Sequence, residues 1–200
     1  MSVAFAFDLD GTVTLDELLP LIAKALELEE EIEFLTDLTI NSVIPFDMSF
    51  KLRFALLKSI KLSFIQSVIE NASLDDDIAH FIRSNSDNCY IVTGNIDQWV
   101  KPIIDNLGCE IYASKAKCEG DCCTELLYIN KKAEAIQRIR KKHDFIVAIG
   151  EGANDTGMFQ EANLSICYGG VHSPYKDLMK YANYLINDGK TLCRLLNTLL

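Results

Sequence analysis

The sequence predicts an α/β fold: a doubly wound parallel sheet with a small helical cap inserted after the first strand. Three observations support this prediction. Short, nearly uncharged apolar runs recur along the chain, helical patterns separate most of them, and one long segment near the N-terminus breaks the alternation. With 200 residues, of which 49% are hydrophobic, the chain is long and apolar enough to build a sizeable core.

Within these apolar runs, polar residues do not alternate with apolar ones. Such uninterrupted runs are typical of parallel strands that are buried on both faces. They comprise residues 3–7, 89–92, 145–149, 164–168 and 184–186. Helical patterns predict helices at residues 97–107, 130–143 and 154–162, and another opened by the pair Ser173-Pro174. Strands that alternate with helices in this way predict an open, Rossmann-like sheet.

Residues 15–74 contain no clear strand pattern. They predict consecutive helices at 15–28, 29–35, 48–60 and 63–72. We therefore expect two parts, a core made of residues 1–14 and 75–200 and a helical cap made of residues 15–74.

The net charge of −10 argues against non-specific binding of nucleic acid or of anionic membranes. No apolar run approaches the ~20 residues that cross a bilayer, and the N-terminus lacks a secretory signal pattern. We expect a cytoplasmic protein whose partner is a small molecule. The sequence does not predict the oligomeric state.

Three of the seven cysteines, Cys118, Cys122 and Cys123, cluster around Glu119-Gly120-Asp121. Without a second pair of ligands at zinc spacing, this cluster does not predict a zinc site. It predicts a hairpin turn in which Cys118 faces Cys122. The sequence leaves open whether these two cysteines form a labile disulfide.

Polar residues follow three of the predicted strands. Asp8 and Asp10 follow the first, Thr93-Gly94-Asn95 the second, and Glu151 and Asp155 the third. Because ligands of such sheets bind beyond the carboxyl ends of the strands, we expect these residues to share one crevice. Crowded carboxylates need a cation, and oxygen donors suit Mg²⁺.

Four segments carry a resemblance to a known family. They are "DLDGT" (8–12), "VTGN" (92–95), a lysine near Asn130, and "GEGANDTGMF" (150–159). In this order they resemble the four motifs of the haloacid dehalogenase superfamily, and the match spans most of the chain. The resemblance implies a Mg²⁺-dependent phosphomonoester hydrolase that forms an aspartyl-phosphate.

The family's roles fall on matching residues of this chain. Asp8 would be the nucleophile, and Asp10 would protonate the leaving group and then activate water. Thr93 would hydrogen-bond the phosphoryl group. Lys132, rather than its neighbour Lys131, would neutralise charge beside Asp8.

The resemblance also implies a Mg²⁺ site made by Asp8, Asp10 (through its backbone carbonyl), Glu151 and Asp155. Glu151 departs from the family, which has an aspartate at this position, and the longer side chain puts metal affinity and turnover in question. Asp155 would be either a direct ligand or a water-mediated one.

The position of the cap resembles the phosphoserine phosphatase branch. There, Glu17 would hold the substrate's amino group, Arg53 its carboxylate, and Thr93 with Gly94 its phosphate. Arg53 lies within an apolar helical stripe, so it needs an anionic partner, which is either the substrate or a glutamate of the cap, or it must extend to water.

The branch's glycine-bearing "AMxGxxxF" text is absent at residues 41–46, "NSVIPF". The favoured reaction is hydrolysis of L-phosphoserine. Two alternatives stay open: a phosphatase or phosphotransferase for another small phosphorylated metabolite, and a weakly active or non-catalytic protein of the same fold because of Glu151.

Overall fold

A computed structural model describes residues 2–40 and 43–200, so the first two residues of the segment 41–46 lie outside the description. The strands are β1 (Val3–Phe7), β2 (Cys89–Ile96), β3 (Glu110–Glu119), β4 (Cys122–Tyr128), β5 (Phe145–Gly150), β6 (Leu164–Tyr168) and β7 (Tyr184–Ile186). They form one sheet in the order β4-β3-β2-β1-β5-β6-β7. All neighbouring pairs are parallel except β3 and β4. The predicted α/β fold is confirmed.

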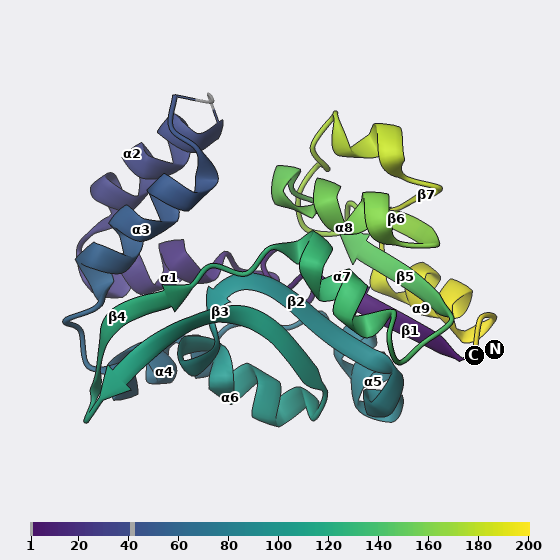
Figure 1. Cartoon of the computed structure of the whole chain (residues 1–200), viewed down its shortest axis with the longest axis horizontal. Coiled ribbons are helices and arrows are strands. Elements are labelled where there is room, and N and C mark those ends of the chain that lie inside the picture. Colours follow the sequence, from purple (N-terminus) through teal and green to yellow (C-terminus); the bar gives the residue numbers. More distant parts are fainter. Residues whose placement is uncertain (1, 41–42) are drawn as a thin grey trace.

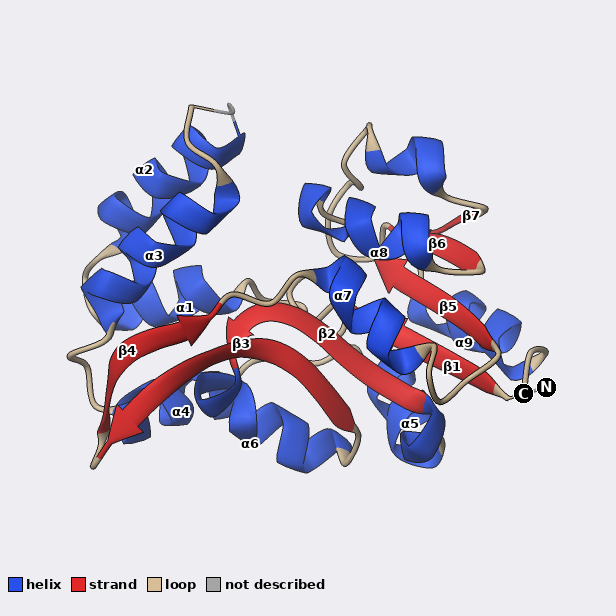
Figure 2. Cartoon of the chain, in the orientation of Figure 1, coloured by secondary structure: helices blue, strands red, loops and turns tan. Residues whose placement is uncertain are grey.

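Strand β1 lies in the middle of the sheet and is buried on both faces. Val3, Phe5 and Phe7 point into the larger core, whereas Ala4 and Ala6 face the smaller one. Helices α5 (Asp76–Ser84), α6 (Asp97–Leu107) and α9 (Gly189–Asn197) cover the phenylalanine face, and α7 (Lys132–Ile139) and α8 (Thr156–Glu161) cover the alanine face (Figure 2). No helix in the described part of the chain is long and apolar enough to cross a membrane.

Between β1 and α5 the described residues form four helices: α1 (Leu18–Ala25), α2 (Glu29–Ile40), α3 (Phe46–Leu57) and α4 (Leu62–Glu70). Figure 1 shows α2 and α3 side by side, projecting from the sheet. The chain leaves and re-enters at one place, where Thr14 pairs with Leu74 and the amide of Leu15 donates to the carbonyl of Ser73 (2.8 Å). This supports our proposed division into a core (1–14, 75–200) and a cap (15–74).

The sequence did not predict α5 or α9, and of the strands β3 and β4 it predicted only the hairpin turn that joins them. It also predicted a helix opening at Ser173-Pro174, and this prediction is wrong. The structure has only a short 3-10 turn at Leu178–Tyr181. The amide of Tyr175 donates to the carbonyl of Glu151 (2.8 Å), which holds the preceding stretch beside the loop after β5 instead of in a helix.

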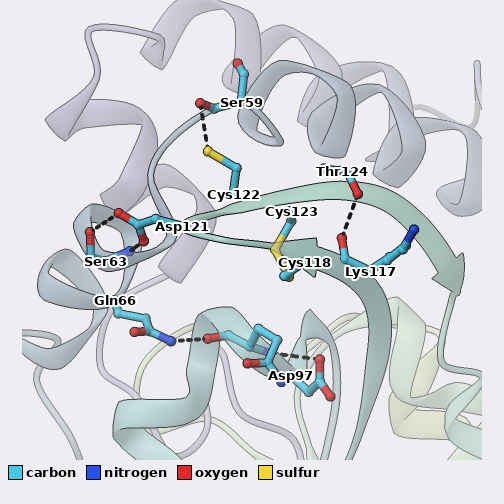
Figure 3. Close-up of a disulfide and its surroundings, with 11 residues drawn as sticks. Ser59, Ser63, Gln66, Asp97, Lys117, Cys118, Asp121, Cys122, Cys123 and Thr124 are labelled. Atoms are coloured by element: carbon cyan, nitrogen blue, oxygen red, sulfur yellow. Dashed lines mark hydrogen bonds between the residues drawn. A yellow bond between two sulfur atoms is a disulfide. The ribbon is translucent and has the colours of Figure 1, made fainter.

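The cysteine cluster forms a hairpin, as predicted, but with a different pairing (Figure 3). Cys118 lies opposite Cys123 and forms a disulfide with it, whereas Cys122 lies opposite Glu119. The turn of the hairpin is the two residues Gly120-Asp121, which sets Glu119 opposite Cys122, so Cys118 lies opposite Cys123. The prediction that Cys118 faces Cys122 is therefore wrong.

The tip of this hairpin contacts the start of α4. The backbone carbonyl of Asp121 accepts from the amide of Leu62 (2.7 Å). The Asp121 side chain accepts from both the amide (2.8 Å) and the hydroxyl (2.6 Å) of Ser63 (Figure 3). Asp121 thus satisfies free amides in the first turn of α4, as a capping residue does.

Candidate active site

A cavity of about 410 Å³ opens where the carboxyl ends of the central strands meet the cap helices. Its core wall is lined by Asp8, Asp10, Gly94, Asn95, Glu151 and Asn154. Its cap wall includes Glu17, Thr36, Phe46, Phe50 and Arg53. The cavity lies at the point where the strand order reverses around β1, which is where ligands of such sheets bind.

Asp8 follows β1 directly and is 3% exposed. Its Oδ1 accepts from the amide of Leu9 (2.7 Å) and contacts Nζ of Lys132 (2.5 Å). Within the described residues nothing donates to its Oδ2. Burial and the nearby charge of Asp155 raise the pKa of Asp8 well above its usual value, and Lys132 opposes this rise.

Lys132 is the first residue of α7 and is 5% exposed. Its ammonium group lies between two carboxylates, Asp8 at 2.5 Å and Asp155 at 2.6 Å. Burial alone would lower the pKa of Lys132, but the charges of Asp155 and Asp8 raise it above its usual value, so the lysine stays protonated. Lys131 is exposed. Of the two adjacent lysines, the structure thus places Lys132 beside Asp8.

Asp155 is fully buried, and both of its oxygens are bonded. Oδ1 accepts from Lys132, and Oδ2 accepts from the amides of Glu151 (2.9 Å) and Gly152 (2.8 Å). It therefore orders the loop after β5 as well as the lysine. The sequence left two roles open for Asp155, a direct metal ligand or a water-mediated one. Because both of its oxygens are already bonded, the water-mediated role is favoured.

Asp10 lies in the turn that follows β1. Its Oδ1 accepts from the amide of Leu18 at the start of α1 (3.0 Å), and its Oδ2 accepts from Nδ2 of Asn95 (2.6 Å). Burial raises the pKa of Asp10, and the bond from Leu18 opposes the rise. Gly11 has φ +66°, a conformation that favours glycine, and a Cβ there would lie 3.2 Å from a carboxylate oxygen of Glu17.

The end of β2 supplies two of the predicted residues. Thr93 is buried beneath the wall, and its hydroxyl accepts from the amide of Asn95 (3.1 Å). Gly94 lines the cavity itself. A Cβ on Gly94 would lie 3.2 Å from the ring of Phe46, so glycine lets this cap residue approach the core wall closely.

Glu151 lines the cavity, and its carbonyl is fixed by the amide of Tyr175. Burial, then the charges of Asp155 and Glu17, raise the pKa of Glu151 from 4.5 to about 7. The surrounding protein therefore does little to stabilise the negative charge of this carboxylate.

The carboxylates of the core wall are oxygen donors of the kind that Mg²⁺ binds. Within residues 2–40 and 43–200, no three histidine, cysteine or acidic side chains lie close enough together to hold a metal ion. Mg²⁺, however, usually keeps several waters and takes only one or two carboxylates besides substrate oxygens. Asp8, Asp10 and Glu151 offer oxygen donors on one wall, with raised carboxylate pKa values that a cation would lower. These residues fit the ion on that basis.

Arg53 lies on α3 and is nine-tenths buried in the cap wall. Its Nη2 donates to the hydroxyl of Thr36 (2.9 Å), whereas its Nε has no acceptor within the described residues. Burial lowers the pKa of Arg53, and Glu17 opposes this. The alternative ion pair with a cap glutamate is not found in the described part of the chain.

Glu17 precedes α1 at the exposed mouth of the cavity, 3.6 Å from Nε2 of His172. Partial desolvation and the charge of Asp10 raise the pKa of Glu17 to about 7. The remaining cap wall is apolar. Phe46 and Phe50 stack with ring centroids 5.9 Å apart, and Leu19, Pro20 and Ile32 extend this surface, which we call the apolar collar.

Three polar residues of the cavity, Asn95, Asn154 and Thr36, were not assigned to the site from the sequence. Asn95 belongs to the "VTGN" segment, so its place next to Thr93 and Gly94 was a usable signal. Thr36 lies 17 positions before Arg53, and no local pattern links the two side chains.

Fold and site together define a capped α/β enzyme with a carboxylate-rich pocket at the switch point of its sheet. A family model described as haloacid dehalogenase-like hydrolase matches residues 5–160. The chain belongs to this family. The predicted family and the predicted kind of enzyme, a phosphatase of that family, are therefore confirmed.

Among its relatives, the chain is 28% identical over 175 residues to a phosphoserine phosphatase of Methanocaldococcus jannaschii, covering 81% of this chain and 83% of that protein. It is 25% identical over 215 residues to a 2-hydroxy-3-keto-5-methylthiopentenyl-1-phosphate phosphatase of Bacillus velezensis, covering 92% and 89%. A solved structure of a substrate-bound phosphoserine phosphatase complex superimposes with TM-score 0.82 at 22% identity, covering 98% of each chain. This similarity confirms the fold.

Proposed function

We propose that this protein is a Mg²⁺-dependent phosphomonoesterase that acts through Asp8, with L-phosphoserine as its favoured substrate. One observation carries the proposal: a single cavity joins the buried Asp8–Lys132 pair to the guanidinium group of Arg53, whose Nε has no acceptor among the described residues. A small substrate with a phosphate at one end and a carboxylate at the other would satisfy both ends.

In the first step, a carboxylate oxygen of Asp8 attacks phosphorus while the ester P–O bond breaks. Asp10 gives its proton to the leaving alkoxide oxygen. In the second step, water attacks the phosphorus of the aspartyl-phosphate and gives its proton to Asp10. The bond between Asp8 and phosphorus breaks, which releases inorganic phosphate and restores the Asp8 carboxylate.

Two further groups stabilise the negative charge of the phosphoryl group. Lys132 is held positive between Asp8 and Asp155, within 2.5–2.6 Å of both, so its charge needs no reorganisation during the reaction. Thr93 brings a hydroxyl to the end of β2 next to Gly94. Both groups belong to the core, and neither depends on the nature of the leaving group.

Mg²⁺ would be held by Asp8, the backbone carbonyl of Asp10 and Glu151, and when bound it would neutralise the charge on phosphoryl oxygens. Asp155 would support this site through its bonds to the amides of Glu151 and Gly152. The extra methylene of Glu151 would change the fit of the ion and not the identity of the donor atom.

The leaving group would meet the cap wall. Arg53 would bind the substrate carboxylate, and Glu17, at the cavity mouth, its amino group. The names of several relatives, phosphoserine phosphatases at 23–28% identity, support this choice of substrate.

The apolar collar and the match to the Bacillus velezensis protein favour a second candidate, a phosphatase for another small phosphate ester with a more apolar leaving group. A phosphotransferase would share the first step, and in its second step an alcohol would attack the aspartyl-phosphate in place of water. A non-catalytic role has less support, because Asp8, Asp10 and Lys132 are all present and lie together at the cavity.

The test is phosphate release from L-phosphoserine, O-phosphoethanolamine and a panel of other small esters, with Mg²⁺ or EDTA and with or without acceptor alcohols. Asp8→Asn is expected to abolish turnover of every ester. Arg53→Gln is expected to raise KM for phosphoserine by about 10–100-fold, the worth of a charged hydrogen bond. It should leave phosphoethanolamine, which lacks the carboxylate, unchanged. Preference for an ester without a carboxylate would contradict phosphoserine as the substrate but not the proposed reaction. No turnover of any ester would contradict both the substrate and the reaction.

A further inference from the structure

Asn95 is a buried side chain of the core wall that the mechanism above does not use. It lies near the end of β2, is 5% exposed and lines the cavity. Its Nδ2 donates to Oδ2 of Asp10 at 2.6 Å. A cavity-lining amide could turn to water or substrate, yet this one is committed to the carboxyl group that moves the protons.

Asp10 is held by donors from two different parts of the molecule. The amide of Leu18 belongs to the first cap helix and bonds Oδ1, whereas Asn95 belongs to the core sheet and bonds Oδ2. Two donors on opposite oxygens fix the plane of the carboxyl group. Without Asn95, the Asp10 side chain would be oriented mainly from the cap, which has to admit substrate.

The backbone around Asn95 is itself fixed. Its amide donates to the hydroxyl of Thr93 (3.1 Å). Ser114 of β3 donates to the carbonyl of Gly94 (2.6 Å), and Asn130 donates to the carbonyl of Thr93 (3.0 Å). These bonds tie the end of β2 to strand β3 and to Asn130 in the loop before α7. A donor on so rigid a support can orient a partner accurately.

We propose that Asn95 is the positioning residue of Asp10. It holds the carboxyl group so that its proton reaches the ester oxygen as the ester P–O bond breaks and the bond from Asp8 to phosphorus forms. In the second step the same orientation lets the Asp10 carboxylate take the proton of the attacking water. This inference rests on the proposed function, because it concerns the proton transfers of that reaction.

The test compares leaving groups. An alkyl phosphate needs a proton on its leaving oxygen, whereas 4-nitrophenyl phosphate releases a stable anion without one. With Mg²⁺ present, Asn95→Ala is expected to lower kcat for the best alkyl ester of the panel by about 10–100-fold, part of what general acid catalysis contributes. The pre-steady-state burst of 4-nitrophenolate should keep its rate, because that step needs no acid. The following steady state should slow, because water activation still requires Asp10.

Two variants control for packing. Asn95→Asp keeps the shape of the side chain but replaces the donor with an acceptor, so it should reproduce the pattern if the hydrogen bond is what matters. Asn154→Ala removes another amide from the same wall, and the ratio of rates between the two esters should stay that of the wild-type protein. Thermal unfolding of each variant checks that the fold is retained.

The outcomes separate this inference from the proposed function. An equal loss in the nitrophenolate burst and in alkyl ester hydrolysis, or no loss in either, would overturn the role of Asn95 while the proposed function stands. No burst and no phosphate release by the wild-type protein would overturn both.

Discussion

The two walls of the cavity differ in how far their polar groups are already satisfied. On and beneath the core wall, both oxygens of Asp155 and of Asp10 accept hydrogen bonds, and Asp8 holds a lysine. On the cap wall, Nε of Arg53 has no acceptor in the part of the chain that the structure describes, and Glu17 lies at the exposed mouth. The core wall is preorganised for chemistry, and the cap wall leaves bonding capacity for the ligand. Substitutions in the first should affect every ester, and in the second only esters with the matching leaving group.

The largest effect is expected for Lys132→Met. It leaves Asp8 and Asp155 buried without their cation, so the free energy of unfolding at pH 8 should fall by about 3–5 kcal/mol, and turnover of all esters should be lost. The loss of stability should be smaller at pH 5.5, because Asp8, with its raised pKa, takes up a proton more readily there. Urea unfolding at both pH values measures this. Lys131→Met, at the exposed neighbour, is the matched control, and an equal loss in both variants would contradict the assignment.

A smaller effect is expected from Glu151. Its pKa is raised from 4.5 to about 7, so the folded protein binds this proton more tightly than the unfolded chain does. The stability that this proton contributes is present below pH 4.5 and is lost as the pH rises to about 7. In EDTA, Glu151→Gln should flatten this loss and gain about 1–2 kcal/mol at pH 8, after allowance for solvent screening.

The same pair of proteins tests the metal site without measuring turnover. At pH 8, Mg²⁺ should raise the Tm of the wild-type protein more than that of Glu151→Gln, because the wild-type carboxylate is the one that needs compensation. Equal shifts in the two proteins would argue that Glu151 does not contact the ion.

On the cap wall, Thr36→Val should act only through Arg53. The Thr36 hydroxyl accepts from Nη2 of Arg53 and donates to the carbonyl of Ile32 (2.8 Å). Losing it should raise KM for phosphoserine by about 3–10-fold and leave kcat unchanged. Thr36→Ser, which keeps the hydroxyl, is the control. A similar change with phosphoethanolamine would show that Thr36 shapes the cavity in general and does not serve carboxylate binding.

The smallest effect is expected for Asp121→Ala, far from the reacting groups. The variant loses the bonds from the hairpin tip to Ser63, so Tm should fall slightly while kcat and KM for the best ester stay unchanged. Glu119→Ala, at an exposed position of the same hairpin, should have no effect. A change in kcat with Asp121→Ala would contradict the expectation that this contact stabilises the fold without affecting catalysis.

The parallel strands could be predicted because burial on both faces leaves an uncharged run, as in β1 and β5. Strand β3 could not, because only two of its ten residues are buried and its charged residues interrupt the apolar pattern. The placement of Arg53 in an apolar stripe indicated its buried environment correctly.

Contacts between distant segments were harder to predict than single residues. Thr36 and Arg53 meet across two helices, and Asn95 meets Asp10 across two strands, so each pairing depends on how elements pack. The cysteine pairing depended on the length of the turn, Gly120-Asp121, which composition does not reveal.

The hairpin has a mechanical consequence for the cap. Helix α4 is bonded at its start to Asp121, and Gln66 within it donates to the carbonyl of Gln98 (2.7 Å), which belongs to core helix α6. Helix α4 is therefore bonded to core elements at two places, although the chain order assigns it to the cap. We therefore expect any opening of the cap to involve α1 to α3 and the joint between α3 and α4, where Sγ of Cys122 contacts the carbonyl of Ser59 next to the Cys118–Cys123 disulfide.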